Sequence, residues 1–295
     1  MIGELAVREA LMRWLDARTD PVVDQLFLKG FEYQGQRIAI AGQQGIMKPR
    51  SLQAAISIRT AYTEPTQTPP YADSVGADGL QRYKYRGDDP NHYDNRALRR
   101  AFQDRLPIVW FVGVARGRYE PIYPVYVIAD DPANLEFTLA VDEGQRHLGT
   151  GDLSVDARAY ALRLTKQRLH QPIFRRQVLL AYDGKCSICR LKHLELLDAA
   201  HILADGKPNG QPVVPNGISL CKIHHAAFDA NLLGIRPDLT LHVRDDVLQE
   251  TDGWMLAGGI QGVHNTSLEI LPRARALRPD TERLEERYAE FLAYT

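Results

Sequence analysis

The chain has 295 residues, of which 44% are hydrophobic and 25% are charged, and its formal net charge is −1. This composition is that of an ordinary globular protein long enough for two modest domains, and the balanced charge argues against a protein that binds polyanions over its whole surface. No apolar run reaches the roughly eighteen residues of a membrane span and no secretory signal opens the chain, so we expect a cytoplasmic protein with no membrane partner.

The first expected element is an amphipathic helix within residues 1–20, where apolar residues recur at helical spacing. These are Leu5, Ala6, Ala10, Leu11 and Leu15. From about residue 26 to 141 the chain changes to short β-prone runs separated by Gly, Pro, Asp and Asn. This pattern predicts a curved or barrel-like sheet, interrupted by one helix near residues 95–103, in a domain that we expect to span residues 21–148.

Several segments of this domain follow one another in a characteristic order. They are GIMKP at 45–49, the apolar run AAISI at 54–58, PPYAD at 69–73, DGLQRYKYRG at 78–87, the helical segment and LPIVWFVG at 106–113. This order resembles the SRA (SET-and-RING-associated) domain, a PUA-like barrel that flips a modified cytosine out of DNA. The resemblance implies that Tyr71 and Tyr85 sandwich the flipped base and that Asp73 accepts from its exocyclic amine. Ser74 is an alternative to Asp73, and Arg86 stands where the family usually has Thr.

The same tyrosines also have a purely structural interpretation, because tyrosine is favoured in strands by packing alone. Clustered cations in this domain suit either a solvated surface or contacts with DNA phosphates. The phosphate candidates are Lys48, Arg50, Arg82 and Lys84. Residues 149–180 are polar and basic with helical periodicity, which predicts a helical connector capped by Asp152 or Ser154.

Residues 181–295 form the last expected domain, which holds all three cysteines of the chain. Cys186 and Cys189 form a Cys-x-x-Cys pair, and Cys221 and His224 form a Cys-x-x-His pair. This spacing is typical of a tetrahedral Cys3His site for structural Zn²⁺. The alternative is a set of buried free thiols. Cysteines that all bind zinc also fit a reducing compartment.

A second set of polar residues is interleaved with these ligands. His201 ends an apolar, strand-like run, Asn216 follows a proline, and His225 comes directly after His224. Adjacent helical positions point about 100° apart, so the two neighbouring histidines imply two separate sites. Asp229 lies four residues after His225 on the same helical face, where both side chains can bind one cation.

The ordered His, Asn and His resemble those of HNH nucleases of the ββα-metal class. The resemblance implies that His201 is the general base, that Asn216 holds the loop between two strands, and that His225 binds the catalytic divalent ion. Many HNH nucleases carry Asp or His just before the general base as a further metal ligand, where this chain has Ala200. Asp198, two residues earlier on the same strand face, is then a candidate ligand.

These residue types suit phosphodiester hydrolysis. Imidazole, with an ordinary pKa of about 6.5, can take a proton from water at neutral pH. A divalent cation, for which we expect Mg²⁺ or Mn²⁺, supplies positive charge to the phosphoryl and leaving oxygens.

The expected architecture is therefore α+β, with a PUA-like, SRA-like barrel joined to a ββα-metal HNH domain that contains structural zinc. A helix capped by Asp280 or Thr281 is expected to close the second domain.

Together, the two resemblances imply a modification-dependent, type IV-like restriction endonuclease for double-stranded DNA bearing 5-methylcytosine or 5-hydroxymethylcytosine. Because one HNH site cuts one strand at a time, double-strand cleavage predicts a homodimer. One alternative is an HNH nuclease gated by a nucleotide second messenger or RNA. Another is a zinc-containing DNA reader that does not cut, which Ala200 favours and the intact His201, Asn216 and His225 oppose.

Overall fold

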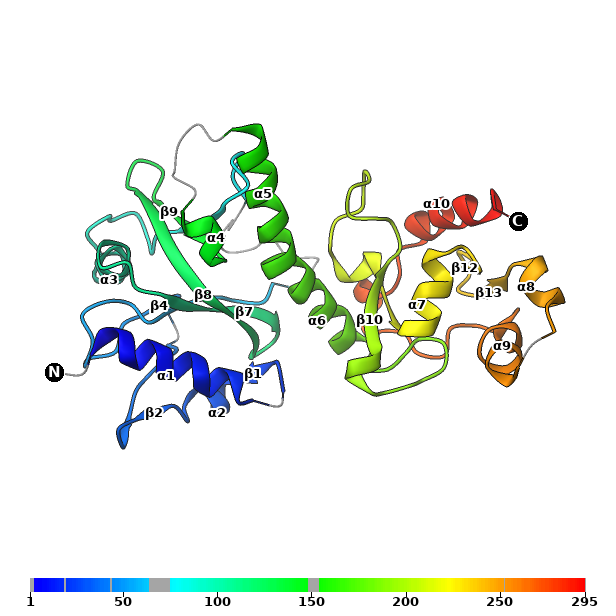
Figure 1. The fold of residues 1–295 in the computed structure, drawn as a ribbon, viewed down its shortest axis with the longest axis horizontal. Coiled ribbons are helices and arrows are strands. Elements are labelled where there is room, and N and C mark those ends of the chain that lie inside the picture. The colour runs from blue at the N-terminus through cyan, green and yellow to red at the C-terminus, as the bar shows by residue number, and fades with distance from the viewer. Residues whose placement is uncertain are drawn as a thin grey trace. The chain divides into compact units, whose positions relative to one another are not determined.

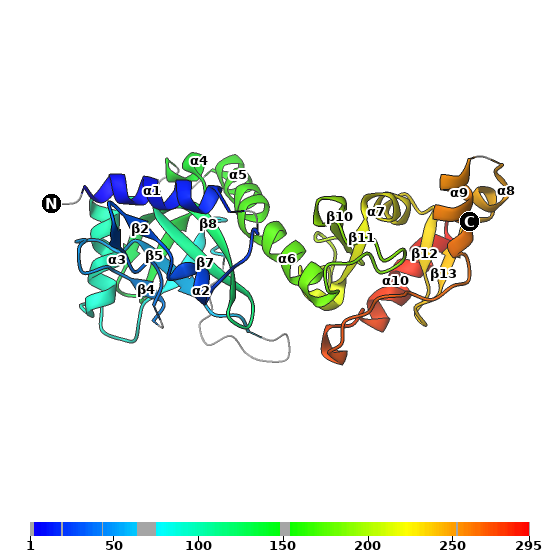
Figure 2. The same cartoon turned by 90° about the horizontal axis from the view of Figure 1, so that it is seen from below.

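A computed structural model of the chain describes residues 3–18, 20–42, 44–63, 75–147, 154–251 and 253–294 (Figures 1 and 2). The chain forms two compact units, Met1–Ile173 and Phe174–Thr295. The division between them lies within the segment that was expected to be a helical connector.

A strongly curled sheet forms the centre of the first unit. Among the described residues it has seven strands, in the order β4-β5-β7-β8-β9-β6 with β1 paired to β8. Among the described strands of this sheet, only β5 and β7 pair in parallel. Bulges interrupt the β7–β8 and β8–β9 registers, which increases the local bend of the strands. The predicted curved sheet is therefore confirmed. The strands are β1 (Val23–Asp24), β4 (Ile46–Met47), β5 (Ser57–Thr60), β6 (Gln81–Lys84), β7 (Ile108–Ala115), β8 (Arg118–Asp131) and β9 (Glu136–Ala140).

Each face of this sheet carries its own apolar cluster. In β7, Val109 and Phe111 belong to the cluster that includes residues of α1 (Glu4–Asp16), whereas Trp110 and Val112 belong to the cluster that includes residues of α3 (Tyr93–Gln103). Successive strand residues point to opposite faces, so a strand covered on both faces reads as a continuous apolar run. Figures 1 and 2 show α1 lying along one face of the sheet. The two helices expected in this region are therefore confirmed.

Short elements complete the first unit around the sheet. They are α2 (Gln25–Leu28), the hairpin of β2 (Glu32–Tyr33) and β3 (Gln36–Arg37), and α4 (Glu143–Arg146).

A continuous helical stretch leads from the first unit into the second. It consists of α5 (Val155–Thr165), the π-helix η1 (Lys166–His170) and α6 (Gln171–Ala181). Ser154 caps its start by accepting from the backbone N–H of Ala157, while Asp152 lies outside the described residues. The buried Gln145 side chain donates to the Ala161 carbonyl at 2.7 Å and to Thr165 Oγ1 at 2.8 Å, which ties α5 to the first unit.

The second unit has the ββα order that the sequence predicted. Strands β10 (Leu197–His201) and β11 (Gly217–Cys221) pair antiparallel, and α7 (Lys222–Asp229) follows β11 directly. One apolar cluster contains residues of α6, both strands and α7, together with Leu284 of the closing helix α10 (Thr281–Leu292). Asp280 caps α10 by accepting from the backbone N–H of Arg283, as expected.

The remaining elements of the second unit are short. They are the 3₁₀ turns η2 (Leu194–Leu196), η3 (Val214–Asn216), η4 (Gln261–Val263) and η5 (Arg275–Leu277), the strand pair β12 (Leu233–Ile235) and β13 (Leu241–Val243), and the helices α8 (Asp245–Gln249) and α9 (Trp254–Gly259).

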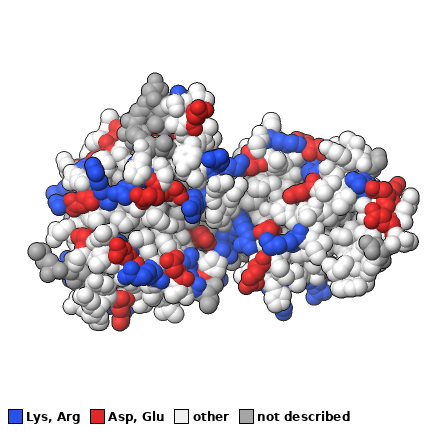
Figure 3. All heavy atoms as spheres, viewed as in Figure 1, with Lys and Arg blue, Asp and Glu red and all other residues white. Residues whose placement is uncertain are grey.

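The surface carries charges of both signs. On the face of each unit drawn in Figure 3, Lys and Arg side chains are interspersed with Asp and Glu, in keeping with the formal net charge of −1. No described helix combines the length and the apolar character that crossing a membrane requires.

Candidate active site and metal centre

The four expected zinc ligands come together where β11 meets α7. Cys221 ends β11 and precedes the first turn of α7, which carries His224, and Cys186 and Cys189 lie on the turn before β10. All four ligand atoms lie within 4.8 Å of one another. His224 Nδ1 is 3.5 Å from Cys186 Sγ and 3.2 Å from Cys221 Sγ. The Sγ atoms of Cys189 and Cys221 are 3.9 Å apart.

These distances fit a tetrahedral zinc ion. Zn–S bonds of about 2.3 Å place two sulfur ligands about 3.8 Å apart around such an ion. His224 Nε2 donates to the Gly259 carbonyl at 2.7 Å, which leaves Nδ1, on the side of the sulfurs, free to coordinate. Hydrogen bonds with Cys186 and then Cys189 lower the pKa of the Cys221 thiol, whereas bonds with Cys186 and then Cys221 raise the pKa of the Cys189 thiol. Without an ion, the sulfurs therefore share protons, and the fit to zinc rests on the distances and the ligand types. The cluster can therefore hold structural zinc.

His225 faces a different set of groups from its neighbour His224. Its Nδ1 lies 3.9 Å from Asp198 Oδ2, and its Nε2 lies 3.3 Å from Asp229 Oδ2. His224 is buried against the cysteines, whereas the His225 side chain is 24% exposed. The separation expected for adjacent helical positions is confirmed, because the two imidazoles belong to two different clusters.

The two carboxylates near His225 approach opposite nitrogens of its ring. An ion bound to one ring nitrogen can therefore be coordinated by Asp198 or by Asp229, but not by both. Asp229 beside Nε2 is 62% exposed, which leaves it accessible to a hydrated cation. Asp198 is instead engaged by Arg175, with Nε to Oδ1 at 3.2 Å, and by Lys222, with Nζ to Oδ2 at 3.3 Å. The expected ligand set is thus divided into a His225–Asp229 pair and an Asp198 carboxylate on the far side of the imidazole.

Asn216 is fully buried and makes three hydrogen bonds to backbone groups. Its Oδ1 accepts from the Leu203 N–H at 2.9 Å, and its Nδ2 donates to the carbonyls of Leu203 at 3.0 Å and Gln211 at 3.1 Å. These bonds close the loop between β10 and β11, as expected for this residue. A buried amide with both its donor and acceptor groups satisfied fixes the backbone around it.

His201 ends β10 opposite Gly217 of β11 and is half-buried. Its ring stacks on that of Phe174 from α6, with centroids 4.1 Å apart and an interplanar angle of 23°. Ala200, directly before it, is fully buried in the apolar core. A carboxylate or imidazole at position 200 would therefore enter that core, which agrees with the apolar residue found there.

Of the residues expected to read the base, the structure describes only Tyr85 and Arg86. Tyr71, Asp73 and Ser74 lie outside the described residues. Tyr85 is only 2% exposed, its ring packs on Phe137 with centroids 4.5 Å apart, and its hydroxyl bonds to Asp130. Burial, followed by the bond to Asp130, raises the pKa of Tyr85 to about 12.

In this arrangement Tyr85 has no ring face open to a base. The burial of Tyr85 therefore supports a structural role for this tyrosine and contradicts the expectation that its ring stacks on a flipped base. Arg86 is paired with Asp94 and bonds to Gln44.

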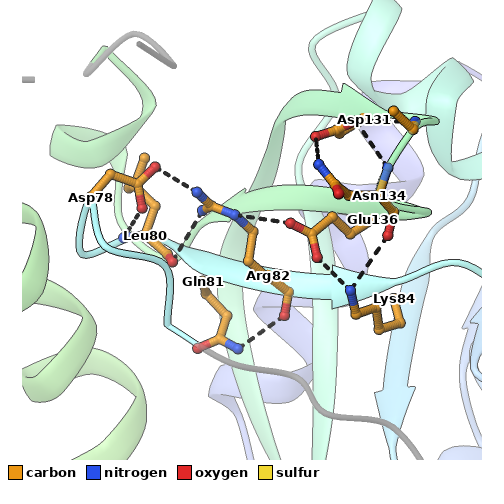
Figure 4. A network of polar contacts seen from close by, with 9 residues as sticks. Asp78, Leu80, Gln81, Arg82, Lys84, Asp131, Asn134 and Glu136 are labelled. Atoms are coloured by element: carbon orange, nitrogen blue, oxygen red, sulfur yellow. Dashed lines mark hydrogen bonds and ion pairs between the residues drawn. The ribbon is translucent and has the colours of Figure 1, made fainter. Parts of the chain in front are cut away.

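Two of the expected phosphate contacts are already paired with acidic residues (Figure 4). Arg82 forms ion pairs with Asp78 at 2.7 Å and with Glu136 at 3.4 Å, and Lys84 pairs with Glu136 at 2.6 Å. Their charges are neutralised locally, which argues against a phosphate-binding role.

The two remaining candidates differ from each other. The Lys48 ammonium donates to the Leu52 carbonyl at 2.8 Å and lies over the Tyr93 ring, 5.3 Å from its centroid. Arg50 is exposed, so it is the candidate whose surroundings best allow a phosphate contact.

Sequence reasoning missed three residues that contact the expected site: Phe174, Arg175 and Lys222. Arg175 Nη2 also donates to the carbonyls of Leu194 at 2.8 Å and Leu197 at 2.7 Å. The first two residues lie in the segment that was interpreted as a connector. The four-residue spacing of Phe174, Val178 and Tyr182 was the available signal that one helix face packs against the nuclease fold.

The match to a protein-family model agrees with this geometry. Residues 186–236 match the family model of the HNH endonuclease, and this segment contains all four zinc ligands as well as the expected His201, Asn216 and His225. Among solved structures, the chain is similar to one titled "Modification dependent TagI restriction endonuclease", with 16% sequence identity and a TM-score of 0.31, over 84% of this chain and 85% of that chain. No curated protein matches the chain. The chain contains an HNH endonuclease domain and is a metal-dependent DNA endonuclease.

Proposed function

We propose that His201 is the general base of this endonuclease and that His225 and Asp229 hold the catalytic cation. His201 accepts a proton from water, the resulting hydroxide attacks phosphorus, and the bond from phosphorus to the leaving oxygen breaks. A bound Mg²⁺ or Mn²⁺ supplies the positive charge that stabilises the phosphoryl and leaving oxygens. Asn216 holds the β10–β11 loop in place, and the negative charge of Asp198 lies on the Nδ1 side of the His225 ring, 3.9 Å away.

The observation that carries this proposal is the placement of three side chains in one ββα unit. His201 ends the first strand, Asn216 secures the loop by three backbone bonds, and His225 projects from the helix away from the zinc ligands. Two clusters with separate partners, one of sulfurs and one of carboxylates, agree with a structural ion and a catalytic ion in the same domain.

We further propose that the first unit directs cleavage to DNA that carries a modified cytosine, which makes the protein a modification-dependent restriction endonuclease. The order of SRA-like motifs and the curled sheet of that unit support this reading. Tyr71 stacks on the flipped base, and Asp73, or Ser74 in its place, bonds to it. Tyr85 supports the site from the core. Two chains act together to cut both strands.

Matched plasmids containing cytosine, 5-methylcytosine or 5-hydroxymethylcytosine test this proposal. Purified protein with Mg²⁺ or Mn²⁺ should cut at least one modified plasmid much faster than the unmodified one, and His201→Ala should cut none. Equal cleavage of all three plasmids would contradict cytosine reading. A gate that responds to a nucleotide second messenger or RNA then becomes the leading function for the first unit.

A further inference from the structure

We propose that Phe174, on α6, is a positioning residue for His201, holding the imidazole ring in the orientation that proton abstraction from water requires. This inference rests on the proposed role of His201 as general base. It assigns a function in catalysis to a helix that lies before the matched HNH segment 186–236.

The contact between the two rings is close and nearly parallel. Their centroids are 4.1 Å apart and their planes are 23° from parallel, and Phe174 is 2% exposed. Aromatic pairs in such an arrangement attract each other beyond the effect of burial alone. The terminal torsion of an imidazole side chain has a broad energy profile, so contacts with the ring set its orientation. The stack on Phe174 is one such contact, and it covers one face of the ring.

Gly217, the strand partner of His201, leaves the space that this stack needs. A Cβ atom at position 217 would lie 2.4 Å from Val178 Cγ2 and 2.8 Å from Phe174 Cζ. Any larger residue at this position would therefore push α6 away from the end of the β10–β11 ladder. The absence of a side chain opposite the general base is thus explained by the approach of Phe174.

A third residue, directly after the end of α6, contacts the same point. Tyr182 is fully buried, and it donates its hydroxyl proton to the Gly217 carbonyl at 3.1 Å. Burial raises the pKa of Tyr182, so this hydroxyl keeps the proton that it donates. Phe174 and Val178 on α6 and Tyr182 just after it are spaced four residues apart, so all three side chains point toward Gly217.

A purely structural role for Phe174 makes a different prediction from a positioning role. A structural residue lowers the stability of the unit, and its loss affects activity only through the folded fraction. A positioning residue also changes the rate of the chemical step in the folded enzyme, because a misplacement of about 1 Å can cost about a hundredfold in rate. DNA binding should change little in either case, since Phe174 is buried.

The test compares Phe174→Leu with Leu179→Ala in the full chain. Leu179 is the control because it is also 2% exposed, lies on the same helix and belongs to the same core. Leu179→Ala removes most of a buried side chain, so it tests the effect of lost packing alone. Single-turnover nicking of plasmid DNA is measured with Mn²⁺, at a temperature where circular dichroism shows both variants folded. Phe174→Leu should lower the maximal rate constant about tenfold to a hundredfold, with the half-saturating protein concentration within about twofold. Leu179→Ala should keep the maximal rate constant within about twofold.

Proton NMR gives an independent readout of the stack. The ring protons of His201, assigned by their loss in His201→Gln, should show an upfield ring-current shift in the parent and in Leu179→Ala but not in Phe174→Leu. Phe174→Met, which fills a similar volume without a ring, replaces Phe174→Leu if that variant does not fold. Zinc content should equal that of the parent in every variant.

Two outcomes would overturn the proposal. One is a parental rate constant in Phe174→Leu despite loss of the ring-current shift, and the other is an equal slowing in both variants. Failure of the proposed function is distinguishable from either, because His201→Ala would then cut DNA at the parental rate whatever residue stands at position 174.

Discussion

At the scale of single residues, the partner of each imidazole nitrogen determines which group His224 and His225 can bind. His224 Nε2 bonds to the Gly259 carbonyl and directs Nδ1 to the cysteines, whereas His225 has a carboxylate on each side. The 3.9 Å separation of His225 Nδ1 and Asp198 Oδ2 is an ion-pair distance, longer than a hydrogen bond. His224 and His225, although adjacent, therefore face different partners, as their different proposed roles require.

Removing the general base should abolish cleavage and leave DNA binding nearly unchanged. His201→Ala removes the group that accepts the proton of water, while the contacts that hold DNA are made elsewhere. We expect a loss of about a hundredfold or more in the rate of nicking, with binding of the same duplex within about twofold of the parent. Cleavage by His201→Ala at the parental rate would show that another group activates water.

The two carboxylates beside His225 should respond differently to substitution. Asp229→Ala removes a proposed ligand, so the Mn²⁺ concentration that gives half-maximal nicking should rise about tenfold or more. Asp198→Asn keeps an oxygen acceptor for Arg175, so its metal requirement should rise less. Nicking measured over a range of Mn²⁺ concentrations decides the matter, and a larger rise for Asp198→Asn would exchange the roles of the two residues.

At the scale of elements, the Cys3His cluster joins the turn before β10, the end of β11 and the first turn of α7. These three segments carry or adjoin all the residues proposed for catalysis. The β10–β11 ladder pairs only five residues on each strand. An ion held by the cluster would therefore add a strong link between these two strands and α7. A metal that binds only the folded state stabilises that state by its full binding free energy.

Loss of one buried thiolate should unfold this part of the protein. The parent should contain about one zinc per chain, and Cys186→Ser should lose it and lower the melting temperature by about 10 °C or more. Metal analysis and thermal unfolding in reducing buffer measure both quantities. Cys186 is fully buried, so a folded and zinc-free parent would leave the free-thiol interpretation as the correct one.

At the scale of the whole molecule, a continuous helical stretch connects two units with separate cores. Ile173 packs against the sheet cluster of the first unit, and Phe174, the next residue, belongs to the core of the second. The first unit has few unpaired cations among the expected phosphate contacts, since Arg82 and Lys84 are paired with carboxylates. Recognition by that unit is therefore proposed to depend on a base pocket more than on a basic surface.

Substitutions in the proposed pocket should change binding of modified DNA and leave the nuclease intact. Stacking of a base on an aromatic ring is worth roughly 1–3 kcal/mol, so Tyr71→Ala should weaken binding of the modified duplex about tenfold or more. Asp73→Ala should mainly relax the preference for cytosine, because a carboxylate accepts from an amine and rejects a carbonyl. Binding is measured in a His201→Ala background to prevent cleavage.

Tyr85→Phe is the matched control for these variants. It keeps the buried ring and removes the hydroxyl that bonds to Asp130, so we expect lower stability and an unchanged preference between modified and plain DNA. Unchanged binding by both Tyr71→Ala and Asp73→Ala would contradict cytosine reading by this unit.

The sequence by itself determined the Cys3His cluster, the ββα order and the separation of the two adjacent histidines. These features depend on short spacings, such as Cys221 to His224 within one helical turn, where backbone geometry alone decides which side chains meet. The bonds of Asn216 could be anticipated for the same reason, since they close a local loop.

Only the tertiary structure decided which residues from distant segments meet one another. The stack of Phe174 on His201, the burial of Tyr85 and the pairing of Arg82 with Glu136 each join segments far apart in the chain. Packing selects such partners by shape and burial, and no local spacing encodes them. The division of the two carboxylates around His225 arises in the same way, because Asp198 comes from a strand and Asp229 from a helix.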